Sequence, residues 1–207
     1  MKIKVNKTTQ PIRSQSDRDA LASYFWNRNL RDYALFIFGI YTGRRISDLV
    51  RLNVRDVAFI DKKGRFSIKE RLEIQEKKTS KFINFVLAPQ ARRALSKYLI
   101  RRKKSAPSMG AVLNEPLFKS QKARNNGEFR ITQEHAWYVL NKAAKECGLN
   151  YKIGTHSLRK TFGYMLYNKG VSIEVIQKVL NHSSAAITLA YIGITQDDID
   201  EAILSLD

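Results

Sequence analysis

The strongest constraint on the fold is the segment LRDYALFIFGIY, residues 30–41, which the sequence predicts as a helix that is apolar nearly all the way round. Such a helix is buried, because a helix on a protein surface keeps a polar face. The segment ends at Thr42-Gly43 and is shorter than the roughly 18 apolar residues that indicate a membrane span. The sequence therefore predicts a globular domain with this helix in its interior.

The pattern between about Val57 and Leu87 has a period of two, unlike the rest of the chain. The segments FSIKERLEIQ and KFINFVLAP alternate or are rich in β-branched and aromatic residues, and the lysine-rich turn EKKTSK separates them. This pattern is typical of strands. It predicts a small antiparallel sheet whose tightest hairpin tip carries Lys77, Lys78 and Lys81.

Helices are expected on both sides of this sheet. Ser16 is the expected N-cap of the first helix, and Thr132 that of a helix running to about Cys147. Gly170 stands where a helix C-cap is expected. The other predicted helices cover residues 47–52, 89–102, 156–168, 172–180 and 184–191, with basic loops at 101–110 and 119–129. Helices, then a short sheet, then helices predict an α+β fold that is mainly helical.

The charge of the chain favours a polyanionic partner. The 207 residues include 37 Lys and Arg against 19 Asp and Glu, a formal charge of +18. Nucleic acid explains this excess better than an anionic membrane surface, because the sequence has no long apolar run and no signal peptide. We therefore expect a cytoplasmic protein. Cys147 is the single cysteine, which excludes an intramolecular disulfide and disfavours a thiolate zinc site.

Two short motifs place groups that bind or activate phosphates. In THSLRKTFGY, His156 and Arg159 are three residues apart and project from the same side of a helix. Arg holds two phosphate oxygens with its planar fork, and His moves a proton near neutral pH. In TGRRIS, Arg44 and Arg45 stand at the start of a helix, where anions are favoured. The alternative is structural: a partly buried His beside a surface Arg, and solvated caps.

Two further candidates carry weight only in combination. His182 lies in a turn, NHSS, where His is more often a capping or core residue. Tyr191 follows it by nine residues and is one of nine tyrosines. A phenol with a pKa near 10 is a poor nucleophile until cationic neighbours or a base activate it.

Taken in order, these motifs resemble the signature of the tyrosine recombinase (phage integrase) family, which is Arg, Lys, His-x-x-Arg, His or Trp, and Tyr. The resemblance covers roughly residues 40–191 and includes the His-to-Tyr spacing of nine. The matching residues are Arg45 in TGRRISDL, Lys78 in KTSK, His156 and Arg159 in HSLRKTFGY, His182 in LNHSS and Tyr191 in TLAYIGI.

The resemblance implies a reaction at a DNA phosphodiester. Tyr191 would attack the phosphorus, leaving a 3′-phosphotyrosyl link and a free 5′-hydroxyl, while Arg45 and Arg159 would hold the phosphate oxygens. Lys78 would protonate the departing 5′ oxygen, and His156 would take the proton of the tyrosine.

The resemblance further implies that His182 donates a hydrogen bond to the phosphate and that no metal or other cofactor takes part. Double-stranded DNA is the expected partner. Site-specific recombination is the expected function, as integration, excision or inversion. The alternatives are a type IB topoisomerase-like enzyme and a DNA-binding regulator of the same fold without catalysis.

The sequence departs from the family pattern at four places. Arg44 beside Arg45 leaves two candidates for one guanidinium, and Lys77 beside Lys78 leaves two for the lysine. Asp48 replaces the commoner Glu, and Asn181 stands where Gly usually precedes the His.

Three regions are expected along the chain. Residues 1–15 are predicted as a basic arm that orders on a partner, and residues 16–194 as the catalytic domain. Most family members carry an additional N-terminal domain that closes around DNA, so the chain resembles the short members such as the fimbrial inversion recombinases, or a catalytic fragment. The arm and the loop at 101–110 must then hold the DNA, which predicts a modest and strongly salt-dependent affinity.

The third region, residues 195–207, is predicted as an acidic C-terminal helix. From Tyr191 onward the chain has five acidic residues and no Lys or Arg, and Thr195 and Asp198 can cap the helix. Its apolar stripe consists of Ile199, Ala202, Ile203 and Leu206. In the family this segment packs in trans within a tetramer on two DNA sites, so a homo-oligomer on DNA is expected; packing in cis is the alternative.

Overall fold

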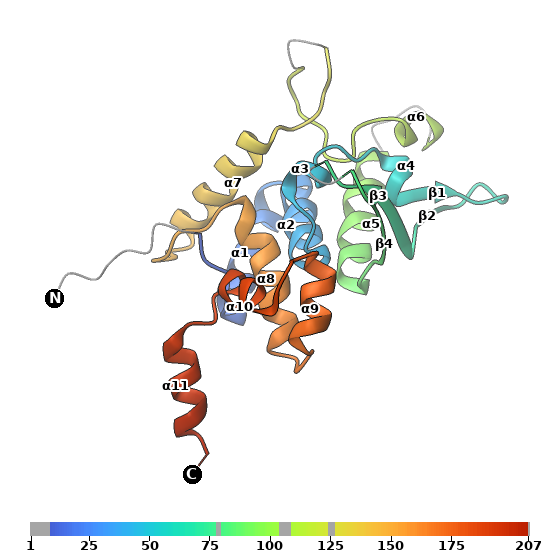
Figure 1. Ribbon diagram of the computed structural model, residues 1–207. Coiled ribbons are helices and arrows are strands. Elements are labelled where there is room, and N and C mark those ends of the chain that lie inside the picture. Colours follow the sequence, from blue (N-terminus) through green and yellow to red (C-terminus); the bar gives the residue numbers. More distant parts are fainter. Residues whose placement is uncertain (1–8, 78–79, 104–108, 124–126, 207) are drawn as a thin grey trace.

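The computed structural model describes residues 9–77, 80–103, 109–123 and 127–206 (Figure 1). Helices make up most of this part of the chain, and two small hairpins lie beside them. The helices are α1 (Gln15–Arg28), α2 (Leu30–Thr42), α3 (Ile46–Leu49), α4 (Val54–Val57), α5 (Pro89–Lys103), α6 (Met109–Leu113), α7 (Gln133–Glu146), α8 (Thr155–Tyr167), α9 (Ile173–Leu180), α10 (Ala185–Ile192) and α11 (Gln196–Leu204). The strands are β1 (Ala58–Ile60), β2 (Phe66–Ile68), β3 (Arg71–Gln75) and β4 (Phe82–Val86). This architecture confirms the predicted fold class.

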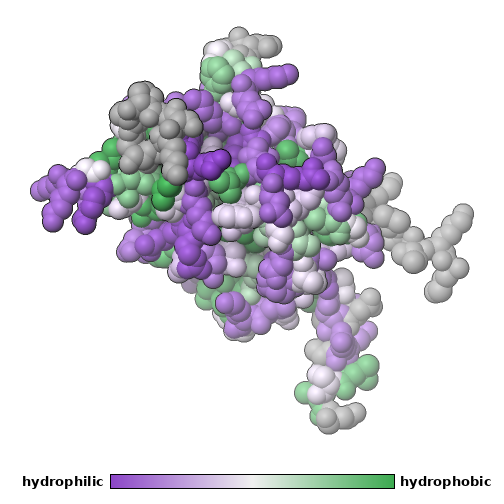
Figure 2. Space-filling model, turned by 180° about the vertical axis from the view of Figure 1, so that it is seen from behind, coloured by the Kyte–Doolittle hydropathy of each residue, from purple (hydrophilic) through white to green (hydrophobic). Residues whose placement is uncertain are grey.

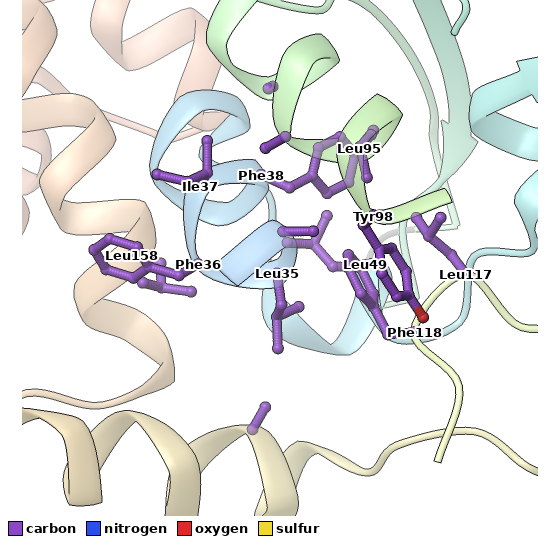
Figure 3. Close-up of a cluster of buried hydrophobic side chains, with 14 of the residues drawn as sticks. Leu35, Phe36, Ile37, Phe38, Leu49, Leu95, Tyr98, Leu117, Phe118 and Leu158 are labelled. Atoms are coloured by element: carbon purple, nitrogen blue, oxygen red, sulfur yellow. The ribbon is translucent and has the colours of Figure 1, made fainter. Parts of the chain in front are cut away.

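Helix α2 is the centre of the molecule, as its apolar sequence predicts. It packs against α1, α5 and α8, and its side chains Phe36 and Phe38 are fully buried. Figure 3 shows these rings between Leu158 of α8 and Leu95 of α5. The helix ends at Gly43, which adopts the left-handed conformation with φ of 61° that Gly tolerates best. The chain can therefore turn sharply out of the core at this point.

The predicted sheet is two separate hairpins. Strand β1 pairs antiparallel with β2, and β3 pairs antiparallel with β4. The segment FSIKERLEIQ divides between Lys69 and Glu70, where the chain changes its partner strand: Lys69 N–H donates to Val57 O beside the β1–β2 pair, and Glu70 O accepts from Leu87 N beside the β3–β4 pair. In β3, Leu72 and Ile74 are buried while their neighbours face solvent.

Several expected boundaries differ from the structure. The N-cap of α1 is Ser14, whose Oγ accepts a hydrogen bond of 2.9 Å from Asp17 N, so Ser16 lies inside the first turn. Thr132 caps α7 as predicted. The C-cap of α8 is Asn168, and Gly170 follows it with φ of 75°. Short elements such as α4 and α6 escape prediction because one turn of helix has too few residues to show a period.

The end of the predicted arm packs on the domain. Ile12 is fully buried, and its N–H donates to Thr161 Oγ1 of α8 at 2.8 Å. Gln10 N–H donates to Lys152 O at 2.9 Å. The described end of the arm, from residue 9 to residue 13, thus contacts α8 and the segment that precedes it.

Helices α8, α9 and α10 pack on one another around a small second core of Ile176, Leu180 and Ile192. Helix α11 extends away from this body (Figure 1), and its tip is apolar (Figure 2). Thr195 and Asp198 cap it as predicted. Among the described helices, none has both the length and the apolar character of a membrane span.

Candidate active site

The predicted site residues meet where four segments come together: the α2–α3 turn, the start of α8, the α9–α10 turn and the end of α10. A cavity of about 450 Å³ lies there, and Arg45, His156 and Arg159 contribute to its lining together with Lys77. Of the six candidates, five lie in the described part of the chain. Lys78 lies outside the described residues.

Arg159 is held in place by backbone carbonyl groups. It is only 2% exposed, and its Nη1 donates to Gly43 O at 2.6 Å while its Nη2 donates to Leu180 O. These bonds tie α8 to the end of α2 and the end of α9. Burial lowers the pKa of this guanidinium, although Arg stays protonated in proteins. Arg159 is therefore a fixed positive charge at the cavity wall.

The two adjacent arginines point to different places. Arg45 precedes α3 and lines the cavity, and its Nη1 lies 2.9 Å from Glu76 Oε1. Arg44 is 2% exposed, and its Nη2 donates to Val179 O at 2.7 Å while its Cζ lies 5.0 Å from the centre of the Phe85 ring. Burial lowers the pKa of Arg44 to about 10. Arg45 therefore has access to the cavity, whereas Arg44 is buried and links the α2–α3 turn to α9.

Tyr191 stands on the last turn of α10 with its hydroxyl 3.5 Å from His156 Nδ1. Its ring is edge-on to that of His182, with 4.8 Å between the centroids, and Lys160 Nζ lies 5.3 Å from its centre. Burial raises the pKa of Tyr191, and the nearby arginines, Arg159 first, act in the opposite direction. Because burial prevails, the phenol is protonated at neutral pH and a base must remove its proton.

His182 follows Asn181, which adopts the left-handed conformation with φ of 49°. Asn tolerates this conformation better than most residues other than Gly, so the turn is kept without the Gly that the family usually has. His182 Nδ1 lies 3.2 Å from Thr188 Oγ1, and that hydroxyl donates to Ser184 O at 3.0 Å. Thr188 therefore accepts, and the neutral imidazole carries its proton on Nδ1.

The charge state of His182 follows from its surroundings. Burial, with Arg159 and Arg45 nearby, lowers its pKa to about 4. His182 is thus neutral at pH 7 in the protein without DNA. An anion placed between these groups would favour the protonated ring, which can donate from both nitrogens.

The lysine-rich turn reaches the cavity. Lys77 lines it, and Lys77 N–H donates to Asp48 Oδ1 at 2.9 Å. Lys81 lines a different hollow, together with Arg44 and Phe82. Because Lys78 lies outside the described residues, its role as the catalytic lysine stays a prediction.

Sequence reasoning missed one charged group in the site. Glu76 is 1% exposed and forms an ion pair with Arg45, whereas the sequence predicted only a lysine-rich turn here. A signal was present, because Glu76 continues the alternation of Leu72 and Ile74, the buried positions of β3.

Comparisons with known proteins agree with this geometry. Residues 15–197 match the phage integrase family. The chain is 39% identical over 188 residues to the "Probable integrase/recombinase YoeC" of Bacillus subtilis, and the alignment covers 91% of each chain. It is 31% identical to the "Tyrosine recombinase XerD" of Corynebacterium glutamicum, and this alignment covers 84% of this chain and 51% of that protein. The chain therefore spans most of the first relative and about half of the second.

Solved structures share the fold. A XerA recombinase structure aligns with a TM-score of 0.69 at 22% identity, covering 97% of this chain and 65% of that one. A XerH recombinase bound to its palindromic difH substrate aligns with a TM-score of 0.66 at 21% identity. The alignment covers 96% of this chain and 53% of the XerH chain. The family match covers most of the chain, and both the similarity to YoeC and the shared fold agree with it. This chain therefore belongs to the phage integrase family and is a tyrosine recombinase, an enzyme that cleaves and rejoins DNA.

Proposed function

We propose that this chain is a site-specific recombinase that breaks a DNA strand with Tyr191 and rejoins it to a different 5′-hydroxyl. The observation that carries the proposal is the meeting of Tyr191, His156 and Arg159 beside a cavity that Arg45 also lines. A half-buried phenol beside an imidazole and two guanidinium groups suits attack on a phosphodiester.

Arg45 and Arg159 hold the non-bridging oxygens of the scissile phosphate in this proposal. Negative charge builds on these oxygens as the phosphorus becomes five-coordinate, and fixed donors stabilise it. Removing one such donor typically slows a reaction by about two to three orders of magnitude. The bonds from Arg159 to Gly43 O and Leu180 O fix the guanidinium before DNA binds.

His156 takes the proton of the Tyr191 hydroxyl as the phenolic oxygen forms its bond to phosphorus. The bond from phosphorus to the 5′ oxygen breaks, and Lys78 donates the proton that this oxygen needs. The product is a 3′-phosphotyrosyl ester and a free 5′-hydroxyl. His182 becomes a donor to the phosphate once the anion favours its protonated form. The ester keeps the phosphodiester energy, so a new 5′-hydroxyl reverses the steps without ATP.

Duplex DNA is the proposed substrate. The charge of +18 favours a polyanion, and the structures similar to this chain include XerH bound to difH and a lambda integrase dimer bound to a COC′ core site. Integration, excision and inversion all use the same strand chemistry.

We also propose that α11 docks on a neighbouring copy when the protein assembles on DNA. Ile203, Leu204 and Leu206 are 60%, 77% and 83% exposed, so the helix leaves them uncovered within its own chain. A hollow between β4 and α9 has a matching character: it is lined by Lys81, Lys178 and Arg44, with the apolar rings of Phe82 and Phe85. A basic and apolar hollow suits an acidic and apolar helix. Deleting residues 195–207 should then lower cooperative assembly on DNA.

The proposal is tested by trapping the covalent intermediate. The protein is mixed in EDTA with nicked duplexes made from the DNA that flanks its gene, and the mixture is denatured and separated by size. Wild-type protein and the control Tyr138→Phe, an exposed tyrosine of α7, should give a protein–DNA band that Tyr191→Phe lacks. A band that persists in Tyr191→Phe would overturn the proposal. Clear binding without any band would favour a DNA-binding regulator.

A further inference from the structure

Glu76 is a buried carboxylate at the edge of the proposed active site. It follows the last residue of β3, Gln75, and opens the lysine-rich turn. The residue is 1% exposed and its side chain 0% exposed. A buried charge is costly unless it is paired, so its position calls for an explanation.

Arginine side chains around Glu76 explain how its charge can be buried. Glu76 Oε1 accepts from Arg45 Nη1 at 2.9 Å, and Arg44 and Arg159 are both close enough to interact electrostatically with the carboxylate. Asp48 is a second buried carboxylate at this place, 4% exposed. Two carboxylates therefore lie among three guanidinium groups, which leaves a positive charge for the phosphate to neutralise.

Glu76 and its neighbour also join two segments of the site. Glu76 binds Arg45 of the α2–α3 turn, and the next residue, Lys77, donates its N–H to Asp48 Oδ1 at 2.9 Å. The base of the lysine-rich turn is thereby fixed to the segment that carries Arg45. At the other side of the turn, Glu76 N–H donates to Lys81 O at 3.0 Å, which closes the hairpin.

The Arg45 side chain needs such a support. Its side chain is 21% exposed, and a long arginine side chain carries considerable rotamer freedom. With Nη1 held by Glu76, the rest of the planar fork has a fixed direction. By contrast, the Arg159 guanidinium is oriented by backbone carbonyls, so its orientation does not depend on a bond to Glu76.

We propose that Glu76 is a positioning residue for strand cleavage: its carboxylate holds Arg45 in the orientation that binds the scissile phosphate, and it anchors the lysine-rich turn beside that arginine. This inference rests on the proposed function. It predicts that removing the charge slows the chemical step and leaves DNA binding unchanged.

The test uses the full chain with Glu76→Gln, which keeps the shape of the side chain. The matched control is Glu73→Gln, an exposed carboxylate on the preceding strand, β3. The rate of covalent-complex formation is measured at saturating protein, and DNA affinity is measured separately. Loss of a charge-assisted hydrogen bond predicts a rate lower by about ten- to a hundred-fold for Glu76→Gln, with affinity within about two-fold. Glu76→Asp should recover part of the rate.

A second readout does not need catalysis. In protein labelled with ¹⁵N-arginine, the side-chain N–H signal of Arg45 is assigned by its loss in Arg45→Ala. Glu76→Gln should shift that signal, while the Arg159 signal and the control Glu73→Gln spectrum stay close to wild type. An unchanged or higher cleavage rate in Glu76→Gln, or an unmoved Arg45 signal, would overturn the inference. Failure of wild-type protein to form any covalent complex would instead count against the proposed function, and the Arg45 signal would still decide the positioning role.

Discussion

The Tyr191 hydroxyl lies 3.5 Å from Nδ1 of His156, although 35 positions separate the two residues in the chain. The distance is at the long end for a hydrogen bond, and hydrogen bonds of this kind often tighten when the substrate arrives. Because burial raises the pKa of Tyr191, the phenol needs a base at neutral pH.

Replacing His156 by Gln should therefore lower the rate of covalent-complex formation by about 10²-fold or more. In the variant, hydroxide has to take the proton, so its rate should rise more steeply between pH 7 and pH 9 than that of wild type. Rates on a nicked duplex across this range check the prediction. The same rate and the same pH profile in both proteins would exclude His156 as the base.

Packing between α8 and α10 should set the position of the nucleophile. A Cβ atom built on Gly163 of α8 would lie 2.6 Å from Ile192 Cγ2 and 3.1 Å from Leu180 Cδ1. Ile192 follows Tyr191 directly, so Gly163→Ala should push the tyrosine away from His156. Overpacking of this kind costs about 1–3 kcal/mol of folding free energy.

Cleavage by Gly163→Ala should fall further than this loss of stability explains, because a folded fraction with a displaced Tyr191 remains. Denaturant unfolding and single-turnover cleavage measure the two effects. Ala186→Val is the control, since it enlarges an exposed position of α10. Full cleavage by Gly163→Ala at temperatures where it is folded would argue against this packing role.

The state of His182 gives a prediction about pH. Its folded-state pKa of about 4 is below the ordinary value near 6.5. The unfolded chain therefore binds more protons than the folded one between these values, and His182 lowers stability as pH falls from about 6.5 to about 4. The ring signals of His182 in an NMR titration should not titrate above about pH 5, and a bound duplex should raise that midpoint. A midpoint near 6.5 without DNA would contradict the account.

Thr188 should matter for the same reason. It is fully buried and accepts from His182 Nδ1. Thr188→Val keeps the size of the side chain but removes the hydroxyl, so the imidazole loses its orientation. We expect slower cleavage, by about ten-fold, with unchanged DNA affinity. The cleavage rate at saturating protein checks this prediction. A rate equal to that of wild type would show that Thr188 does not orient His182 for cleavage.

The lysine assignment can be decided by changing the leaving group. Replacing the bridging 5′ oxygen by sulfur gives a thiolate, which leaves without a proton. Lys78→Ala should cleave ordinary DNA slower by about two orders of magnitude or more and should recover on the sulfur-containing strand. Lys77→Ala should show only a small change on both strands. A defect that recovers in Lys77→Ala alone would transfer the role to Lys77, which lines the cavity.

Local patterns in the sequence predict much of this fold. The all-round apolar character of residues 30–41 identifies the central helix, and the capping residues Thr132 and Thr195 give the starts of α7 and α11. Ile12 could not be placed in this way, because its partner Thr161 is 149 residues away. The division of the sheet into two hairpins could not be predicted either, because the alternation does not show that the chain changes partner between Lys69, bonded to Val57, and Glu70, bonded to Leu87.

The candidate site shows the same limit. The order and spacing of Arg45, His156, Arg159, His182 and Tyr191 indicate the chemistry, and the structure brings these residues to one place. The alternation of β3 puts Glu76 on the buried side, but its pairing with Arg45 could not be predicted, because that arginine lies 31 positions earlier in the chain. A charged residue in a lysine-rich turn is solvated unless the tertiary fold covers it.

The most direct test of the central claim is to find which residue carries the DNA. The covalent complex is digested with nuclease and trypsin, and the masses of the peptides are measured. Residues 179–207 contain no Lys or Arg and only one tyrosine, Tyr191, so they form one peptide. The account predicts that this peptide carries a nucleotide through its 3′-phosphate. A nucleotide on any other peptide, or a link through a 5′-phosphate, would contradict it.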